Sequence, residues 1–131
     1  MNNAVNRYKE VRATTSTPAE LLVALYDGVF RFVNAGKLCF EHKQPARARE
    51  QIAKARNIVS ELLIALDHDA APELCANLAS LYDFCLDRLM LANRHGTSDP
   101  LDDVLRVLTP LREAWKAAAL DVAKQPMART G

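Results

Sequence analysis

Three histidines and three cysteines are the side chains of this sequence best suited to bind a metal ion. Cys39 and His42 lie one helical turn apart, and an antiparallel helical arrangement would bring His95 to the same end of the molecule. A thiolate and two imidazoles are ligands that zinc accepts, so these residues could form a small metal site. A thiol at an apolar helix position usually packs as a small hydrophobic group, and this second interpretation stays open for Cys39.

The sequence lacks the patterns on which catalysis in a helical protein usually depends. Di-metal bundles need a glutamate with a histidine three residues later on two helices, and no glutamate here has that neighbour. Phosphotransfer needs an exposed histidine in the middle of a helix, whereas His42, His68 and His95 all fall at predicted helix ends. The chain also has no Gly-rich phosphate loop and no Gly-x-Ser-x-Gly motif. We therefore expect a protein that is not an enzyme and needs no cofactor.

The composition of the 131 residues indicates a single all-α domain, since 21 Ala and 18 Leu outnumber 9 Val and 3 Ile. The net charge of +1 provides no field for phosphates, which argues against nucleic acid as a partner. No apolar run approaches the ~20 residues that cross a bilayer, and the polar start lacks a signal-peptide core. The odd number of cysteines argues against a disulfide framework. We expect a cytoplasmic protein without membrane insertion.

Apolar residues at helical spacing predict four helices, over about 18–42, 45–67, 72–94 and 100–124. The first and the last begin with a capping residue and a proline, Thr17-Pro18 and Asp99-Pro100. Short links make neighbouring helices antiparallel, which predicts an up-down-up-down four-helix bundle. Pro110 predicts a kink in the fourth helix, because proline removes a backbone hydrogen bond. Residues 1–16 form a polar tail that we expect to cap the bundle.

The first predicted helix is apolar around well over half of its circumference. Its apolar residues include Leu21, Leu22, Val29, Phe30 and Val33. Gly28 and Gly36 each cost about 1 kcal/mol inside a helix relative to alanine, and they allow another backbone to come close. Tight packing inside the bundle would explain either glycine alone. Together with the apolar surplus, the two glycines favour a groove in which the tail or a partner lies.

Two Tyr-Asp pairs, Tyr26-Asp27 and Tyr82-Asp83, each place an aromatic ring beside a carboxylate. Such a pair suits the rim of a binding groove, where the ring is covered and its polar tip stays wet. A ring in the core with its hydroxyl bonded to a neighbouring helix is equally compatible with the sequence. The same two interpretations apply to Asn57, Glu61 and Asn77.

Four short motifs occur in order along the chain. They are Leu25-Tyr26-Asp27-Gly28, the run from Ala55 to Leu62, Asn77-Leu78 with Leu81-Tyr82-Asp83, and Leu111-Arg112-Glu113-Ala114-Trp115. Tyr8, ten residues before Pro18, completes a set whose order and spacing resemble the FliS family of flagellin export chaperones. No single motif is decisive, but the ordered set is specific. Leu91 departs from the family pattern, in which a polar residue is common, and leaves self-association into a homodimer open.

The resemblance implies a cytoplasmic chaperone that binds the disordered C-terminal segment of flagellin, prevents premature polymerisation and aids delivery to the flagellar type III export apparatus. It also implies that the N-terminal segment is a movable cap over part of the binding surface. Other flagellar regulators could share that surface. The candidate contact residues are Tyr8, Val11, Leu22, Tyr26, Asp27, Gly28, Asn57, Glu61, Asn77 and Tyr82. A small metal-binding bundle and a purely structural helical adaptor are the alternatives.

Overall fold

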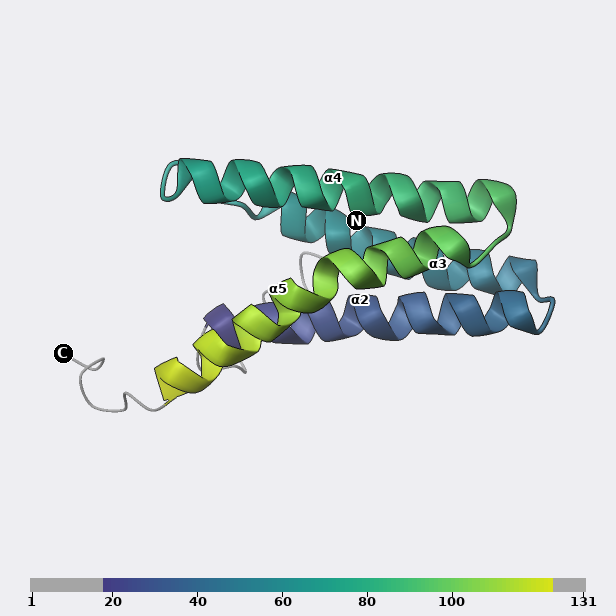
Figure 1. Cartoon of the computed structure of the whole chain (residues 1–131), viewed down its shortest axis with the longest axis horizontal. Coiled ribbons are helices and arrows are strands. Elements are labelled where there is room, and N and C mark those ends of the chain that lie inside the picture. Colours follow the sequence, from purple (N-terminus) through teal and green to yellow (C-terminus); the bar gives the residue numbers. More distant parts are fainter. Residues whose placement is uncertain (1–17, 124–131) are drawn as a thin grey trace.

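The structure, a computed structural model, describes residues 18–123 as four α-helices joined by short turns (Figure 1). The helices are α2 over Pro18–Glu41, α3 over Pro45–Ile64, α4 over Pro72–His95 and α5 over Asp99–Ala123. Both α2 and α4 pack against α3 and α5, so α2 and α4 occupy opposite corners of the bundle. The predicted all-α four-helix bundle is confirmed. Tyr8, Val11 and the Thr17 cap lie outside the described residues.

Proline begins α3 and α4 at the predicted residues, and glycine follows the end of α4. The helices α3 and α4 begin at Pro45 and Pro72. Proline costs no hydrogen bond at a first helical position, because the N–H there has no acceptor within the helix. The helix α4 ends at His95, and the next residue, Gly96, has a φ of 67°, the left-handed conformation that glycine adopts most readily. The Gly96 N–H donates to the carbonyl of Ala92 at 2.8 Å.

The helix α3 ends at Ile64, three residues before the predicted end at 67. The cause is a separate turn at Asp67, whose carbonyl accepts the N–H groups of Ala70 and Ala71. The Asp67 carboxylate also accepts the Ala70 N–H at 3.3 Å, an arrangement that competes with helix continuation.

The helix α5 continues through Pro110 without a break. Proline supplies no N–H to the preceding turn, and the hydroxyl of Thr109 donates to the carbonyl of Leu105 at 2.6 Å. In Figure 1, α5 crosses the bundle obliquely, and its yellow C-terminal part slants away from the line of α4. The kink near Pro110 stays a prediction, while the helix itself is continuous.

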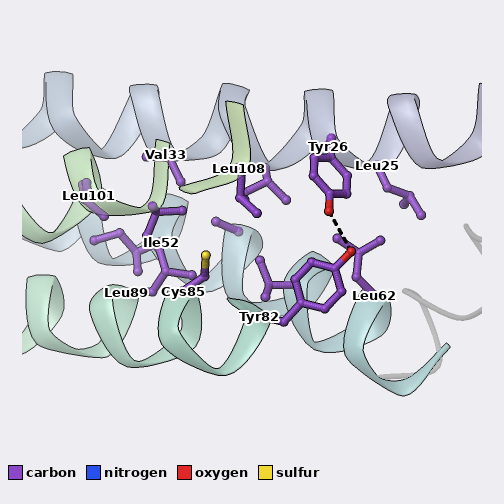
Figure 2. Packing of buried hydrophobic residues seen from close by; sticks show 14 of the residues in the cluster. Leu25, Tyr26, Val33, Ile52, Leu62, Tyr82, Cys85, Leu89, Leu101 and Leu108 are labelled. Atoms are coloured by element: carbon purple, nitrogen blue, oxygen red, sulfur yellow. Dashed lines mark hydrogen bonds between the residues drawn. The ribbon is translucent and has the colours of Figure 1, made fainter. Parts of the chain in front are cut away.

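The core is a column of aliphatic side chains with two tyrosines near one end (Figure 2). Every helix contributes one face to this column, as the apolar spacing predicted. The largest fully buried side chains are Tyr26, Tyr82, Ile52, Leu89, Leu101 and Leu108. Cys75 and Cys85 are buried and Cys39 is partly buried, and all three are free thiols.

Gly28 and Gly36 of α2 allow α3 to approach closely. A Cβ atom on Gly28 would lie 2.9 Å from Cδ1 of Ile58, and one on Gly36 would lie 3.3 Å from Cγ1 of Ile52. Much of the apolar surplus of α2 enters the same packing, since residues such as Val29 and Val33 belong to the core. Both glycines therefore allow α3 to pack closely against α2.

We expect Gly28→Val to lower the free energy of unfolding by about 1–3 kcal/mol, because the added methyl groups must displace Ile58. Gly28→Ala should be nearly neutral, since a gain of about 1 kcal/mol in helix propensity offsets contact with the end of a flexible side chain. Urea unfolding followed by circular dichroism measures both changes. Asn34→Val on the exposed side of α2 is the control. Equal losses for Gly28→Val and Asn34→Val would contradict the close approach of α3.

Candidate functional site

Tyr26 of α2 and Tyr82 of α4 meet across the diagonal of the bundle. Their hydroxyl oxygens lie 2.7 Å apart, with one hydroxyl donating to the other (Figure 2). The two side chains are 0% and 1% exposed. Trp115 of α5 packs edge-on against Tyr26, with ring centroids 6.5 Å apart. Both tyrosines therefore lie in the core, which is the second of the two interpretations that the sequence left open.

Burial makes a phenolate costly and raises the pKa of both Tyr26 and Tyr82 above 10.0. At Tyr26 the Tyr82 hydroxyl and the nearby indole N–H of Trp115 favour the phenolate and offset part of this rise. Burial also raises the pKa of the Cys85 thiol to about 12. All three groups stay neutral at physiological pH, so the tyrosine pair acts as a structural hydrogen bond.

We expect the free energy of unfolding to fall as the pH rises above about 9. In the unfolded chain Cys85 and the tyrosines lose protons near pH 9 and 10, respectively, whereas the fold keeps these groups protonated. The unfolded state then binds fewer protons than the folded state, so the loss continues to at least about pH 12, where Cys85 ionises in the folded protein. Urea unfolding at several pH values measures the loss. Full phenolate absorbance in the folded protein near pH 11 would contradict the raised pKa values.

A pocket of about 190 Å³, here called the end pocket, lies where α2 and α4 begin and α3 ends. Its lining residues are Leu22, Leu62, Ala65, Leu66, Asp67, Leu78, Tyr82 and Trp115. The lining is mostly apolar and includes residues of all four helices. A small-molecule site usually needs roughly 300–1,000 Å³, so the end pocket is better suited to an apolar side chain of a partner.

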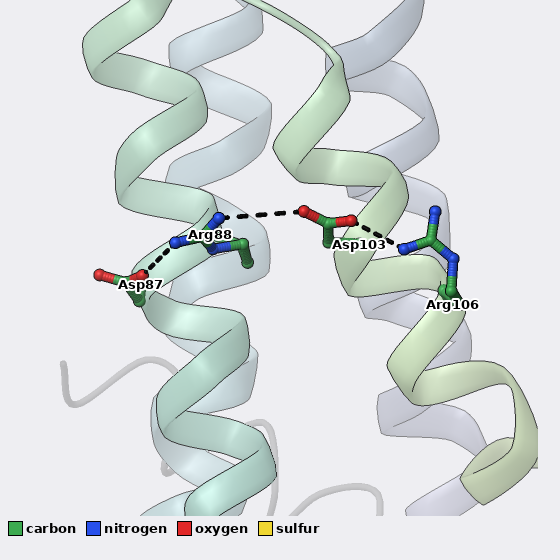
Figure 3. Close-up of polar contacts among 4 residues, drawn as sticks. All are labelled: Asp87, Arg88, Asp103 and Arg106. Atoms are coloured by element: carbon green, nitrogen blue, oxygen red, sulfur yellow. Dashed lines mark hydrogen bonds and ion pairs between the residues drawn. The ribbon is translucent and has the colours of Figure 1, made fainter.

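A row of charged side chains crosses from α4 to α5 (Figure 3). Arg88 lies 2.7 Å from Asp87 on its own helix and 4.0 Å from Asp103 of α5. Asp103 in turn lies 2.8 Å from Arg106. These contacts show which face of each helix borders the other.

Partly exposed apolar side chains share those two faces. Leu81 and Phe84 precede Arg88 by seven and four residues, so they lie on the same face of α4. Val107 and Leu111 follow Asp103 by four and eight residues on α5. We call these four residues the α4–α5 seam. Trp115, one turn beyond Leu111, lines the end pocket, so the pocket lies next to the seam along α5.

The opposite border of α5, against α2, is spanned by ion pairs. Asp27 accepts a hydrogen bond from Arg112 at 2.6 Å, and Lys37 lies 2.5 Å from Asp102. The Arg112 guanidinium also lies over the ring of Phe30, 5.0 Å from its centroid. This border is bridged by side chains at two levels, so the α4–α5 seam and the end pocket are the better candidates for a binding surface.

The predicted contact residues are distributed unevenly around this surface. Leu22 and Tyr82 meet at the end pocket, and Asn77 is exposed one turn before Leu81. The structure does not bring Asn57 and Glu61 of α3 to the seam, since α3 packs against α2 and α4. Phe84, Leu111 and Trp115 belong to this apolar surface but were not among the predicted contact residues, although their apolar spacing and the single tryptophan were visible in the sequence.

The structure gives the alternative metal site no support. Within residues 18–123, no three His, Cys, Asp or Glu side chains are grouped so that they could hold an ion. Cys39 is partly buried on α2, and His42 and His95 are exposed at the ends of α2 and α4. Antiparallel topology brings the three residues to one end of the bundle but does not bring them together. In the same part of the chain, no helix has the length and apolarity needed to cross a bilayer.

Comparison with known proteins agrees with the motifs in the sequence. The model of the family described as flagellar protein FliS matches residues 1–122. This chain belongs to the FliS family. It is 32% identical over 118 residues to the flagellar secretion chaperone FliS of Bacillus subtilis, covering 90% of this chain and 87% of that protein. It is 31% identical over 108 residues to the same chaperone of Salmonella typhimurium, covering 82% of this chain and 80% of that protein. The resemblance to flagellar secretion chaperones is therefore confirmed.

The four FliS-like motifs contact one another in the fold. Tyr26 of the first motif bonds to Tyr82 of the third and packs on Trp115 of the fourth. Asp27 of the first pairs with Arg112 of the fourth, and Gly28 makes room for Ile58 of the second. These residues brace the bundle beside the end pocket. Many residues of the four FliS-like motifs therefore make contacts between helices, and these contacts fix the helices that carry the apolar surface.

Proposed function

We propose that this FliS chain is a cytoplasmic, non-enzymatic chaperone that holds the C-terminal segment of flagellin. The observation that carries the proposal is the set of partly exposed apolar side chains along the α4–α5 seam, with the end pocket beside them at Trp115. A disordered segment rich in apolar residues can fold as a helix on such a surface. Covering both partners' apolar residues would prevent premature polymerisation, and release at the export apparatus would follow.

The polar residues around this surface suit a bound helix of limited length. The ion pair between Arg88 and Asp103 forms a charged boundary at one end of the seam. Asn77 lies on the seam face of α4 and is a candidate hydrogen-bonding partner for the segment. Asn57 and Glu61 would make contact only if the flagellin chain continued from the seam around to α3.

Co-elution with flagellin tests this function. The full chain and flagellin from the same bacterium should elute together in size-exclusion chromatography. Flagellin without its C-terminal segment should elute separately, because the apolar partner surface is missing. A complex that forms equally well with the truncated flagellin would overturn the assignment of this segment.

We further propose that the N-terminal segment covers part of the apolar surface when flagellin is absent, with Tyr8 and Val11 as its apolar contacts. Support comes from position: α2 begins at Pro18, and Leu22, one turn later, already lines the end pocket. A short chain leading away from Pro18 therefore starts beside the surface. Such a cap would compete with flagellin for the same side chains.

Deletion of residues 1–14 is expected to increase the fluorescence of a dye that binds apolar surface. The same deletion should tighten flagellin binding several-fold, because the cap no longer occupies part of the site. Dye titration and calorimetry measure the two effects. Unchanged dye binding together with unchanged affinity would contradict the cap.

A further inference from the structure

Three hydrogen-bond donors lie in the core beside the end pocket: the hydroxyls of Tyr26 and Tyr82 and the indole N–H of Trp115. The tyrosine pair consumes one hydroxyl proton, so the second hydroxyl proton of Tyr26 and Tyr82 remains available. The indole Nε1 of Trp115 is buried, and it lies near Tyr26 without a hydrogen-bond partner among residues 18–123. Buried donors are nearly always bonded in native proteins. The Tyr26 oxygen can accept from the indole, so it is the second tyrosine hydroxyl proton that has no acceptor within this cluster.

The end pocket gives an acceptor a route to the cluster. Tyr82 and Trp115 both line the pocket, and Tyr82 is only 1% exposed to solvent. Tyr26 does not line it. The Tyr26 hydroxyl can donate to the Tyr82 oxygen, which leaves the Tyr82 proton free for a group that enters the pocket. Hydrogen bonds in such a chain polarise one another and become stronger.

We infer that the end pocket takes an apolar side chain of the flagellin segment together with a neutral carbonyl oxygen that accepts a hydrogen bond from Tyr82. The inference rests on the proposed function and adds which chemical groups of the flagellin segment the pocket would recognise. A neutral acceptor is required because the Asp67 carboxylate also lines the pocket and would repel a negatively charged group. Tyr82 would then be a specificity-determining residue, and Tyr26 would position it.

Two variants that lose the same internal hydrogen bond separate this role from a structural one. Tyr82→Phe and Tyr26→Phe each remove one hydroxyl of the pair and keep the ring, so both should be destabilised to a similar extent. Calorimetry with the C-terminal segment of flagellin should show about tenfold weaker binding for Tyr82→Phe. Tyr26→Phe should weaken binding by only about two- to threefold, because the Tyr82 hydroxyl is still present but has lost the hydrogen bond that positions it.

The outcomes distinguish this inference from the proposed function. If the unaltered chain binds the segment and both variants bind it with the same affinity as the unaltered chain, the role of Tyr82 is overturned. The chaperone assignment would still stand. Equal weakening in both variants would also overturn it, since the effect would then follow core stability. Absence of binding by the unaltered chain would refute the proposed function itself.

Fluorescence gives a second readout of pocket occupancy. Trp115 is the only tryptophan in the chain and lines the pocket, so its emission should change with the same saturation as the calorimetric signal. Tyr82→Phe should retain this change at higher peptide concentration, because the apolar side chain still enters. Saturable binding without any change in Trp115 emission would overturn occupancy of the pocket.

Discussion

Phe84→Glu is expected to weaken binding of the flagellin C-terminal segment by about 30-fold or more. Phe84 is 41% exposed on the seam face of α4, and the Arg88 guanidinium lies 5.3 Å from its ring centroid. A glutamate at this position can pair with Arg88 in the free protein, so the fold should be retained. In the complex the same carboxylate would have to lose its water beneath an apolar segment, which is costly.

Leu38→Glu is the matched control for this substitution. Leu38 is 54% exposed and lies on α2, near the end of the bundle opposite the end pocket. The control adds the same charge and removes a similarly exposed apolar side chain, so it should leave affinity within about twofold. Calorimetry and circular dichroism measure binding and folding for both variants. Equal loss of affinity in the two would show that net charge, rather than the α4–α5 seam, governs binding.

Leu108→Ala is expected to lower the free energy of unfolding by about 3 kcal/mol. Leu108 of α5 is fully buried and lies in the central column of the core (Figure 2). The substitution removes apolar burial and leaves a cavity that the surrounding helices fill only in part. The total free energy of unfolding of a domain of this size is usually about 5–15 kcal/mol, so the expected loss is a large share of its stability.

Leu120→Ala on the same helix is the control for Leu108→Ala. Leu120 is 62% exposed, so its truncation removes little buried surface and should change stability by less than about 0.5 kcal/mol. Urea unfolding of both variants gives the comparison. Similar losses at the two positions would contradict the packing of α5 against the core.

The arrangement of the helices could be predicted because its signals are local. Apolar spacing identified the inward faces, and α3 and α4 begin at Pro45 and Pro72, the first residues of two predicted helices. The end of α3 was predicted less well. There the Asp67 carboxylate accepts the backbone N–H of Ala70. Whether such a bond forms in place of further helix depends on the geometry of the turn, which the sequence does not reveal.

The binding surface could be predicted only in part, because burial depends on which faces the neighbouring helices cover. The most apolar helix, α2, suggested a groove, yet α3 and α5 cover much of its apolar surface. Of the six large apolar residues exposed within residues 18–123, four lie instead on α4 and α5, namely Leu74, Phe84, Met90 and Leu120. The ion pair between Asp27 and Arg112 joins residues 85 positions apart, so no local pattern could reveal it.

The two interpretations of Tyr26 and Tyr82 differ in the partner of each hydroxyl. Both residues have the same sequence neighbourhood, a tyrosine followed by aspartate, and this pattern fits a rim or a core. The deciding factor is that α2 and α4 face each other across the diagonal, which brings the hydroxyls to 2.7 Å. Such a contact follows from the register of four helices and has no counterpart in a single sequence window.

Calorimetric titration of the full chain with the C-terminal segment of flagellin from the same bacterium tests the central claim most directly. We predict saturable, equimolar binding with a dissociation constant in the micromolar range or tighter. The heat capacity change should be negative, because apolar surface on the α4–α5 seam and in the end pocket is buried. Absence of saturable binding at tens of micromolar would contradict the assignment of this surface to flagellin.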